Sequence, residues 1–270
     1  MSEHRGPASL CRAILWRVWL EQRGSILLFP ALFCALLVMV VACAQFAPSL
    51  LTGFTRAALE KGAVAQLGVQ PGGAGALSMS FLQLQAPFLL ALFAGMSAAS
   101  IAQRTIGSEA DRGSLEILLA TRYRISEIGV ALLFASFVMA AASWAILVAG
   151  AALTSQLLAS RLGFPLTMDA SSAAAVIAMQ LVLALLAAEV ATIGTLLFPA
   201  LARYRSGMSA DPLQLLASLP ALVIFIVANV RPDLGLASLS LWGLAVGALC
   251  LVAGILLLET WFRPSAFLET

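Results

Sequence analysis

Residues 171–198 read SSAAAVIAMQLVLALLAAEVATIGTLLF, and this stretch decides the fold class. Glu189 is its one ionisable residue. At about 1.5 Å of rise per residue, a helix of this length crosses the ~30 Å of hydrocarbon in a bilayer. The two-residue alternation of a barrel strand is absent, and a helix satisfies its own backbone groups where no water is present. The stretch therefore predicts a transmembrane helix.

Five further apolar stretches of comparable length lie at residues 26–46, 81–103, 128–153, 213–230 and 236–258. Of the 270 residues, 61% are hydrophobic and 10% are charged, and the mean hydropathy is +1.01. A soluble globular domain would be about 25% charged. The sequence therefore predicts an all-α integral membrane protein, with six transmembrane helices in a single domain over residues 1–270.

Basic residues set the expected orientation, because cytoplasmic loops are enriched in Arg and Lys. With a cytoplasmic N-terminus, the inside segments hold Arg5, Arg12, Arg17, Arg23, Arg104, Arg112, Arg122, Arg124, Arg203, Arg205 and Arg263. The outside segments hold only Arg56, Lys61, Arg161 and Arg231. Both termini are therefore expected in the cytoplasm. A single Lys with heavy Ala and Leu usage is typical of a GC-rich bacterial genome, so we expect a multi-pass protein of the bacterial cytoplasmic (inner) membrane.

Residues 8–23 precede the first apolar stretch and mix three kinds of side chain. The apolar and aromatic ones are Leu10, Ile14, Trp16, Trp19 and Leu20, and the basic ones are Arg12, Arg17 and Arg23. Aromatic and basic residues together suit the lipid headgroup region. We expect an amphipathic helix along the inner membrane surface, with a frayed basic leader as the alternative.

Two connecting regions carry glycine and proline. Residues 47–80 form the longest outside segment, and the run Pro71-Gly72-Gly73-Ala74-Gly75 is typical of a flexible turn. Asp211 suits an N-cap and Pro212 a first helical residue for the fifth span. Pro220 lies inside that span, so a kink or a partly re-entrant pair of helices stays open there.

Several chemistries are excluded by the sequence. The glycine run lacks the Lys of the phosphate-binding pattern G-x-x-x-x-G-K-[ST]. The four cysteines show no CxxC spacing, which argues against a metal site or a disulfide framework, and they are Cys11, Cys34, Cys43 and Cys250. No catalytic constellation gathers at one membrane face. A net charge of +2 gives no reason to expect nucleic acid. We expect no enzyme activity, no metal and no cofactor.

The inside loop between the second and third apolar stretches is the most charged part of the chain, and residues 103–121 read QRTIGSEADRGSLEILLAT. After Gly113, the Ser114 hydroxyl can cap a short helix with one apolar face. That face consists of Leu115, Leu118 and Leu119. So short a helix is not stable alone in water, and its apolar face therefore needs a membrane surface or a partner protein.

The acidic residues of this loop favour a partner protein. Glu109, Asp111 and Glu116 are interleaved with the apolar positions. They would be repelled by anionic lipid, whereas an interfacial helix usually carries Lys or Arg beside its apolar face.

Residues 113–119, Gly-Ser-Leu-Glu-Ile-Leu-Leu, resemble a segment in the membrane subunit of ABC transporters of the type-2 permease (ABC-2) family. In that family an acidic stretch followed by Gly-Thr/Ser-Leu-Glu-x-Leu-Leu precedes the third span and forms the coupling helix, which sits in a cleft of the ATPase subunit. The resemblance implies coupling residues at Glu109, Asp111, Gly113, Ser114, Leu115, Glu116, Leu118 and Leu119. It also implies a permease, an exporter, driven by a separate ATPase subunit and paired with a second permease copy, the same or different.

The wider pattern is also similar: an amphipathic helix, six spans, and Ser126-Glu127-Ile128 at the start of the third. One departure is Arg122, where the family commonly has Pro after the Leu-Leu pair, and it puts the end of the coupling helix in doubt. A haem-exporter permease shares much of the pattern, including Asp-Gly-Ser-Leu-Glu, and stays open as an alternative.

Glu189 would be costly inside a bilayer, at ~2.5 kcal/mol or more if ionised, so it must face protein or water or be protonated. It could line a translocation path, or it could be a structural carboxyl bonded to a neighbouring helix through Thr192 or a Gln. Four other amides are expected to bond across helices, with contact to a polar substrate as the alternative: Gln45, Gln83, Gln85 and Gln180. The run of small residues 95–100 predicts a close helix contact.

An ATP-independent secondary transporter or a membrane scaffold is the rival hypothesis. A secondary transporter would normally show intramembrane charges in matched positions of internal repeats, which are missing here. A scaffold gives no reason for an acidic and apolar helix between the second and third spans. The aliphatic spans are compatible with a lipid, a hydrophobic peptide or drug, haem or a polysaccharide as substrate.

Overall fold

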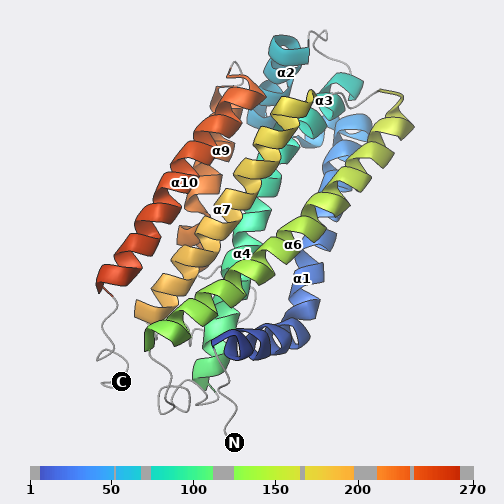
Figure 1. The fold of residues 1–270 in the computed structure, drawn as a ribbon. Helices are drawn as coiled ribbons and strands as arrows, with labels where there is room; N and C mark the ends of the chain where they lie inside the picture. Colours follow the sequence, from blue (N-terminus) through green and yellow to red (C-terminus); the bar gives the residue numbers. More distant parts are fainter. Residues whose placement is uncertain are drawn as a thin grey trace, which may run out of the picture.

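The computed structural model describes residues 7–51, 53–67, 74–111, 125–164, 168–197, 212–231 and 234–261. Within these ranges every regular element is helical (Figure 1). The α-helices are α1 (Pro7–Phe46), α2 (Gly53–Leu67), α3 (Ala74–Ser80), α4 (Ala86–Asp111), α6 (Ile125–Leu162), α7 (Ala170–Leu197), α9 (Pro212–Val230) and α10 (Leu236–Trp261). Two short elements join them, the 3-10 helix η1 (Pro48–Leu50) and the π-helix η2 (Phe81–Gln85).

Six helical stretches of the described chain are long and apolar enough to cross a membrane. They are Cys11–Phe46, Gly75–Ile106, Val130–Leu162, Ala170–Thr195, Pro212–Val230 and Leu236–Leu256. The predicted helical class and the predicted six spans are confirmed at this level. The chain is therefore a multi-pass membrane protein.

The helices α4 and α7 form the centre of the bundle, with α1 and α6 on one flank and α9 and α10 on the other (Figure 1). Small side chains allow α4 and α7 to approach closely. A Cβ on Gly95 would lie 3.7 Å from the Cβ of Ala187, and Ala98 and Ala188 are buried beside it. The close contact predicted for residues 95–100 is confirmed, because small residues let helix backbones pack tightly in lipid.

The helix α1 contains both the amphipathic stretch 8–23 and the first apolar stretch 26–46. The amphipathic stretch 8–23 is helical as expected, and it forms one continuous helix with the first span, Pro7–Phe46. In Figure 1 the N-terminal part of α1 crosses one end of the bundle, here called the base, and the rest of α1 rises along it. The pair Gly24-Ser25 and Pro30, which lacks an N–H, lie between these parts and are common causes of helix bending.

Residues 47–80, which were expected to form a loop, are largely helical where the structure describes them, although residues 71–73 of the predicted glycine turn lie outside the described residues. The helices α2 and α3 pack on each other at the end of the bundle opposite the base (Figure 1). The second span accordingly begins near Gly75, before the predicted Phe81. Gly62 lies inside α2, where a Cβ would come within 3.0 Å of the Ser80 Oγ. This glycine therefore permits helix contact and does not mark a turn.

The π-helix η2 lies where α3 continues into α4. Pro87 has no N–H to donate to the carbonyl four residues earlier, and the Ala86 N–H instead reaches back to the Phe81 carbonyl. Four residues of this π-helical turn, Phe81, Leu82, Gln83 and Gln85, are buried. The bulge therefore continues the spanning helix through a residue that would otherwise break it.

The remaining boundaries differ from the predicted ones in one main respect. The helix α6 extends to Leu162, well beyond the predicted end of the third span at residue 153. The helix α9 begins at Pro212 as predicted and runs unbroken through Pro220 to Val230, so within the described residues α9 is one spanning helix and not a re-entrant one.

The helix α7 begins with an N-cap at Asp169. The Asp169 carboxylate accepts hydrogen bonds from the Ser171 hydroxyl and, at 3.0 Å, from the Ser172 N–H. These bonds lower the pKa of Asp169 from its ordinary value of 3.8 to about 2, because they favour the charged form. An ionised N-cap also interacts favourably with the helix dipole.

Candidate functional site

Glu189 lies in the C-terminal half of α7 and is only 1% exposed. Within the described residues neither of its carboxyl oxygens has a hydrogen-bond partner. Thr192, which we expected as a partner, donates instead to the Ala188 carbonyl of its own helix at 2.7 Å. The expected hydrogen bond that would make Glu189 a structural carboxyl is therefore absent from the described residues.

The space for this carboxyl comes from a glycine on α10. A Cβ built on Gly254 would lie 2.8 Å from the Glu189 Cδ, 2.8 Å from Oε1 and 2.9 Å from Oε2. A Cβ at position 254 would therefore force the carboxyl group to shift. Glu189 and Gly254 therefore form one complementary contact between α7 and α10.

Two more glycines continue this contact along α10. A Cβ on Gly243 would lie 2.8 Å from the Met179 Sδ, and one on Gly247 would lie 2.9 Å from a Val182 methyl. Gly243 and Gly247 form a G-x-x-x-G pattern, a signal of close helix packing in membranes that the sequence reasoning missed. In this chain α7 fills the glycine face of α10, so the face serves the bundle itself.

Buried amides and hydroxyls tie the other spans together. Gln180 of α7 donates to the Pro87 carbonyl of α4 at 2.9 Å, and Gln45 of α1 donates to the Ser78 hydroxyl of α3 at 3.0 Å. The cross-helix role predicted for these two glutamines is confirmed. Gln83 is also buried, and Gln85 lines a hollow described below.

One buried hydroxyl pair was not predicted. The Ser97 and Ser143 hydroxyls lie 2.7 Å apart and join α4 to α6. Each serine lies in a run of small residues, and neither run alone shows which helix its serine faces.

The predicted coupling segment falls mostly outside the described residues. The described chain leaves the base at Asp111, the last residue of α4, and returns at Ile125, the first residue of α6. Glu109 and Asp111 belong to the last turn of α4. The other predicted coupling residues lie outside the described ranges: Gly113, Ser114, Leu115, Glu116, Leu118 and Leu119.

The helices on both sides of that segment pack against the N-terminal part of α1. A buried apolar cluster joins α1, Ile101 of α4 and the first turns of α6. Its members are Ile14, Val18, Ile26, Ile101, Ile128, Ala131, Leu132, Ala135 and Met139. The base is therefore one packed unit, and the ends of α4 and α6 are held by the same part of α1.

Gln22 adds polar bonds to this unit. Its amide nitrogen, in a side chain that is 5% exposed, lies 3.2 Å from the Ile101 carbonyl and 3.2 Å from the Thr105 hydroxyl. Thr105 in turn donates to the Ile101 carbonyl at 2.8 Å. Donors buried at a helix contact fix the relative rotation of the two helices, so α1 and the end of α4 are tied in one orientation.

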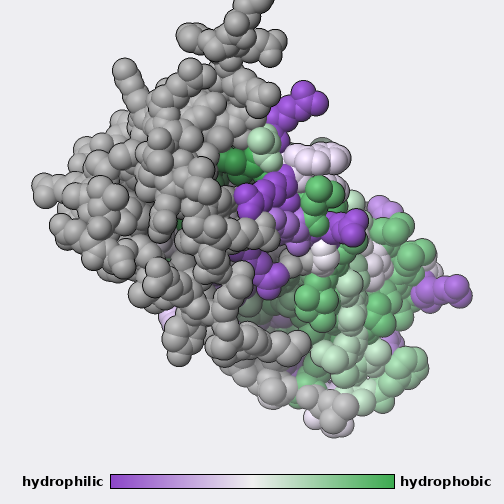
Figure 2. Space-filling model, turned by 90° about the horizontal axis from the view of Figure 1, so that it is seen from below, coloured by the Kyte–Doolittle hydropathy of each residue, from purple (hydrophilic) through white to green (hydrophobic). Residues whose placement is uncertain are grey.

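Seen from the base, the described surface carries hydrophilic side chains next to a hydrophobic flank (Figure 2). Arg12, Arg23 and Arg104 are exposed near this end. Within the described residues no group of three His, Cys, Asp or Glu side chains could hold a metal ion. The described part of the base is therefore suited to contacts with a charged surface.

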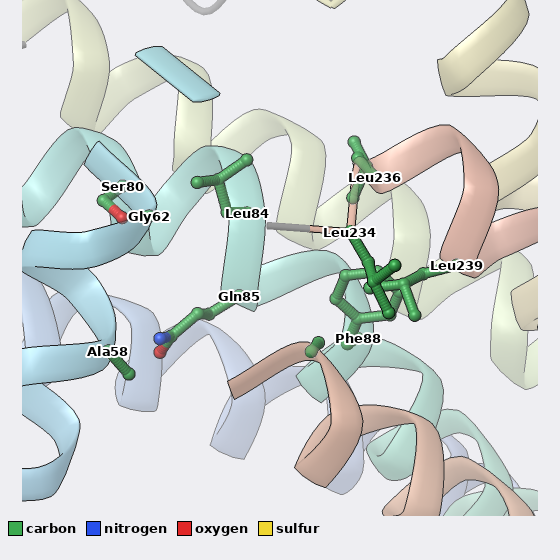
Figure 3. Close-up of a pocket in the computed structure, with 10 residues that line it drawn as sticks. Ala58, Gly62, Ser80, Leu84, Gln85, Phe88, Leu234, Leu236 and Leu239 are labelled. Carbon is green, nitrogen blue, oxygen red and sulfur yellow. The ribbon is translucent and has the colours of Figure 1, made fainter. Parts of the chain in front are cut away.

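A small hollow, partly open at the protein surface, lies at the opposite end of the bundle. It is lined by α2, η2, the start of α4 and the residues around the α9–α10 connection (Figure 3). Phe88, Leu234 and Leu239 meet on one side, and the Gln85 side chain extends toward Ala58 on the other. Its lining is mainly apolar.

Comparisons with a set of protein-family models, with curated proteins and with solved structures found no match to this chain.

Proposed function

We propose that this chain is the membrane-spanning permease subunit of an ATP-binding cassette transporter of the ABC-2 type, an exporter driven by a separate ATPase subunit. The observation that carries the proposal is the motif at residues 113–119 between the second and third spanning stretches. The assembly would contain two permease copies, the same or different, and two ATPase subunits.

The packing at the base supports this proposal. A segment that receives movement from an ATPase must be joined firmly to the helices that it moves. The two ends of the segment, at Asp111 and Ile125, leave helices that pack against the N-terminal part of α1 through one buried cluster. A push on the segment would therefore reach α1, α4 and α6 together and not bend one helix alone.

The central position of α4 extends this route. The helix α4 packs against α1, α6, α7 and α9, so a tilt of α4 changes contacts on both flanks of the bundle. Close-packed helices move as rigid bodies between discrete arrangements, which is the usual form of such transitions. In the proposed cycle, ATP-driven closure of the ATPases brings the two coupling segments together and tilts the spans.

Glu189 would have a role in the proposed transport only in a different arrangement of the spans. At 1% exposure it lines no open path in the present arrangement. It would face a translocation path once α7 and α10 separate at Gly254. A haem-exporter-like permease is the alternative within the family.

Co-purification tests the proposal. The tagged chain is purified from its native host membranes, and ATPases bound in stoichiometric amount are identified by mass spectrometry. Glu116→Arg with Leu118→Asp should remove the ATPase, because it reverses the charge and the polarity of the proposed docking face.

A matched control places the same changes on α2, at the other end of the bundle. Glu60 is partly buried and Val64 is 50% exposed there, so Glu60→Arg with Val64→Asp alters the surface without touching the base. This variant should retain the ATPase. No ATPase with the unaltered chain, or full retention by the Glu116→Arg/Leu118→Asp variant, would favour the secondary-transporter or scaffold hypothesis instead.

A further inference from the structure

The N-terminal part of α1 has a buried face that fixes its rotation. Ile14, Val18, Gln22 and Ile26 recur at every fourth residue, and each is no more than 5% exposed. The apolar ones pack on the ends of α4 and α6, and Gln22 is hydrogen-bonded to α4. This part of the helix therefore cannot roll without breaking buried contacts.

Its outward face is aromatic and basic. Trp16 is 66% exposed, Trp19 41% and Leu20 48%, and Arg12 and Arg23 are exposed at the two ends of the same face. Steps of three and four residues place all five on one side of a helix. At about 1.5 Å per residue, the two arginines lie about 16 Å apart along the axis, with the tryptophans between them.

This face carries basic side chains and no acidic one. Glu21 is the acidic residue of α1, and its Oε1 accepts a hydrogen bond from the Arg17 Nε at 3.2 Å on an adjacent face. Within the described residues, neither Arg12 nor Arg23 forms an ion pair, so both contribute positive charge beside the tryptophans. A surface that complements this basic and aromatic face would carry negative groups, with hydrocarbon just beneath them.

The position in the bundle matches such a surface. The N-terminal part of α1 crosses the base, the end at which the spanning helices leave the membrane-crossing part of the bundle (Figure 1). Tryptophan side chains settle at the headgroup level, and arginines beside them interact with lipid phosphates. The fixed rotation keeps all five side chains of the face turned outward.

We propose that Arg12, Trp16, Trp19, Leu20 and Arg23 form a binding face for anionic phospholipids, with the arginines on the headgroups and the tryptophans and Leu20 at the acyl boundary. The inference depends on the chain spanning a membrane and not on its being a transporter. An arginine near an anionic surface strengthens binding on the order of fivefold. Two such arginines should therefore favour anionic over zwitterionic lipid by roughly 25-fold at low salt.

Tryptophan fluorescence of the full chain in bilayer nanodiscs tests this face. The variant Trp16→Phe/Trp19→Phe keeps the other tryptophans. The difference in emission between the unaltered chain and this variant therefore comes from Trp16 and Trp19. Its quenching is compared between brominated phosphatidylglycerol and brominated phosphatidylcholine, mixed at the same mole fraction into unlabelled lipid. Aqueous iodide serves as the third quencher.

We expect the anionic lipid to quench this emission several times more effectively than the zwitterionic lipid. Arg12→Gln/Arg23→Gln should abolish the preference, and high salt should weaken it. Arg161→Gln, at the exposed end of α6 away from the base, should leave it unchanged. Equal quenching by the two lipids would overturn the proposal. So would quenching by iodide alone, which would place the face in water, or by none of the three, which would indicate a covering protein.

Discussion

Replacing Gly254 with alanine tests the contact between α7 and α10 most sharply. The new Cβ would lie 2.8 Å from the Glu189 Cδ, whereas carbon atoms in van der Waals contact lie about 3.5–4.0 Å apart. The carboxyl is 1% exposed, so it has little room to turn aside. Overpacking of this kind costs about 1–3 kcal/mol. We predict a loss of stability in that range for Gly254→Ala.

Changes at Glu189 show whether the collision is the cause. Glu189→Gln keeps the shape of the side chain, so Gly254→Ala should cost as much in that background as in the unaltered chain. Glu189→Ala removes the colliding atoms, so the added methyl should then cost little or nothing. The coupling free energy between Gly254→Ala and Glu189→Ala should reach about 1–3 kcal/mol, as for residues in direct contact.

Gly24 provides the matched control for the backbone effect. It lies inside helix α1, and a Cβ there would meet nothing within 4 Å. Gly24→Ala should therefore be neutral or stabilising by up to about 1 kcal/mol, the helix preference of alanine over glycine. Stability is measured by reversible denaturation in mixed micelles. Additive effects of Gly254→Ala and Glu189→Ala, or a Gly254→Ala cost equal to that of Gly24→Ala, would refute the contact.

Three further predictions concern polar groups. Gln22→Leu removes the amide bonds to Ile101 and Thr105 and should lower stability by about 1 kcal/mol, measured by the same denaturation. Ser97→Ala and Ser143→Ala should each cost about 0.6 kcal/mol, and the double variant should cost no more than the larger single change, because both break one bond; a sum of the two costs would contradict the pair. Hydrogen bonds lower the pKa of Asp169 to about 2, so its ionised form stabilises the fold above about pH 4 and this contribution is lost as the pH falls toward 2. Asp169→Asn keeps an N-cap acceptor but should flatten this part of the pH dependence of Tm, whereas an unchanged profile would show that the cap does not titrate there.

Long apolar stretches could be placed from the sequence with good accuracy. The fourth span was predicted at residues 171–198, and α7 runs Ala170–Leu197. Length and hydrophobicity decide such a helix locally, because every backbone group inside a bilayer needs an internal partner. Polar residues that bond across helices, such as Gln180, could also be recognised as a class, although the Pro87 carbonyl it binds could not.

Glycine had two uses that local reasoning could not separate. In residues 47–80 the glycines suggested a loop, but Gly62 lies within α2 and lets the Ser80 hydroxyl approach. The same absence of a Cβ at Gly254 accommodates Glu189 from another helix. Whether a glycine breaks a helix or admits a neighbour depends on the tertiary contact, which a single sequence does not state.

The two parts of α1 show a related limit of local patterns. The change from an amphipathic to an apolar pattern near residue 24 suggested two helices, yet the backbone continues through it as one. Hydrophobic pattern predicts which environment a residue meets, whereas the continuity of a helix depends on its backbone hydrogen bonds, and α1 continues through Gly24 and Ser25. The fixed rotation of this part came from Gln22 and the cluster at the base, which are long-range contacts.

The most direct measurement of the proposed function is a photo-crosslink from the coupling segment. A photoreactive phenylalanine derivative replaces Leu118, and a second protein carries it at Val64 on the opposite end of the bundle as the control. After irradiation in native membranes, crosslinked partners are identified by mass spectrometry. We predict that position 118, and not position 64, captures an ATPase with a G-x-x-x-x-G-K-[ST] motif. Capture of lipid alone at position 118, or of the same proteins at both positions, would contradict the assignment of this chain as an ATP-driven permease.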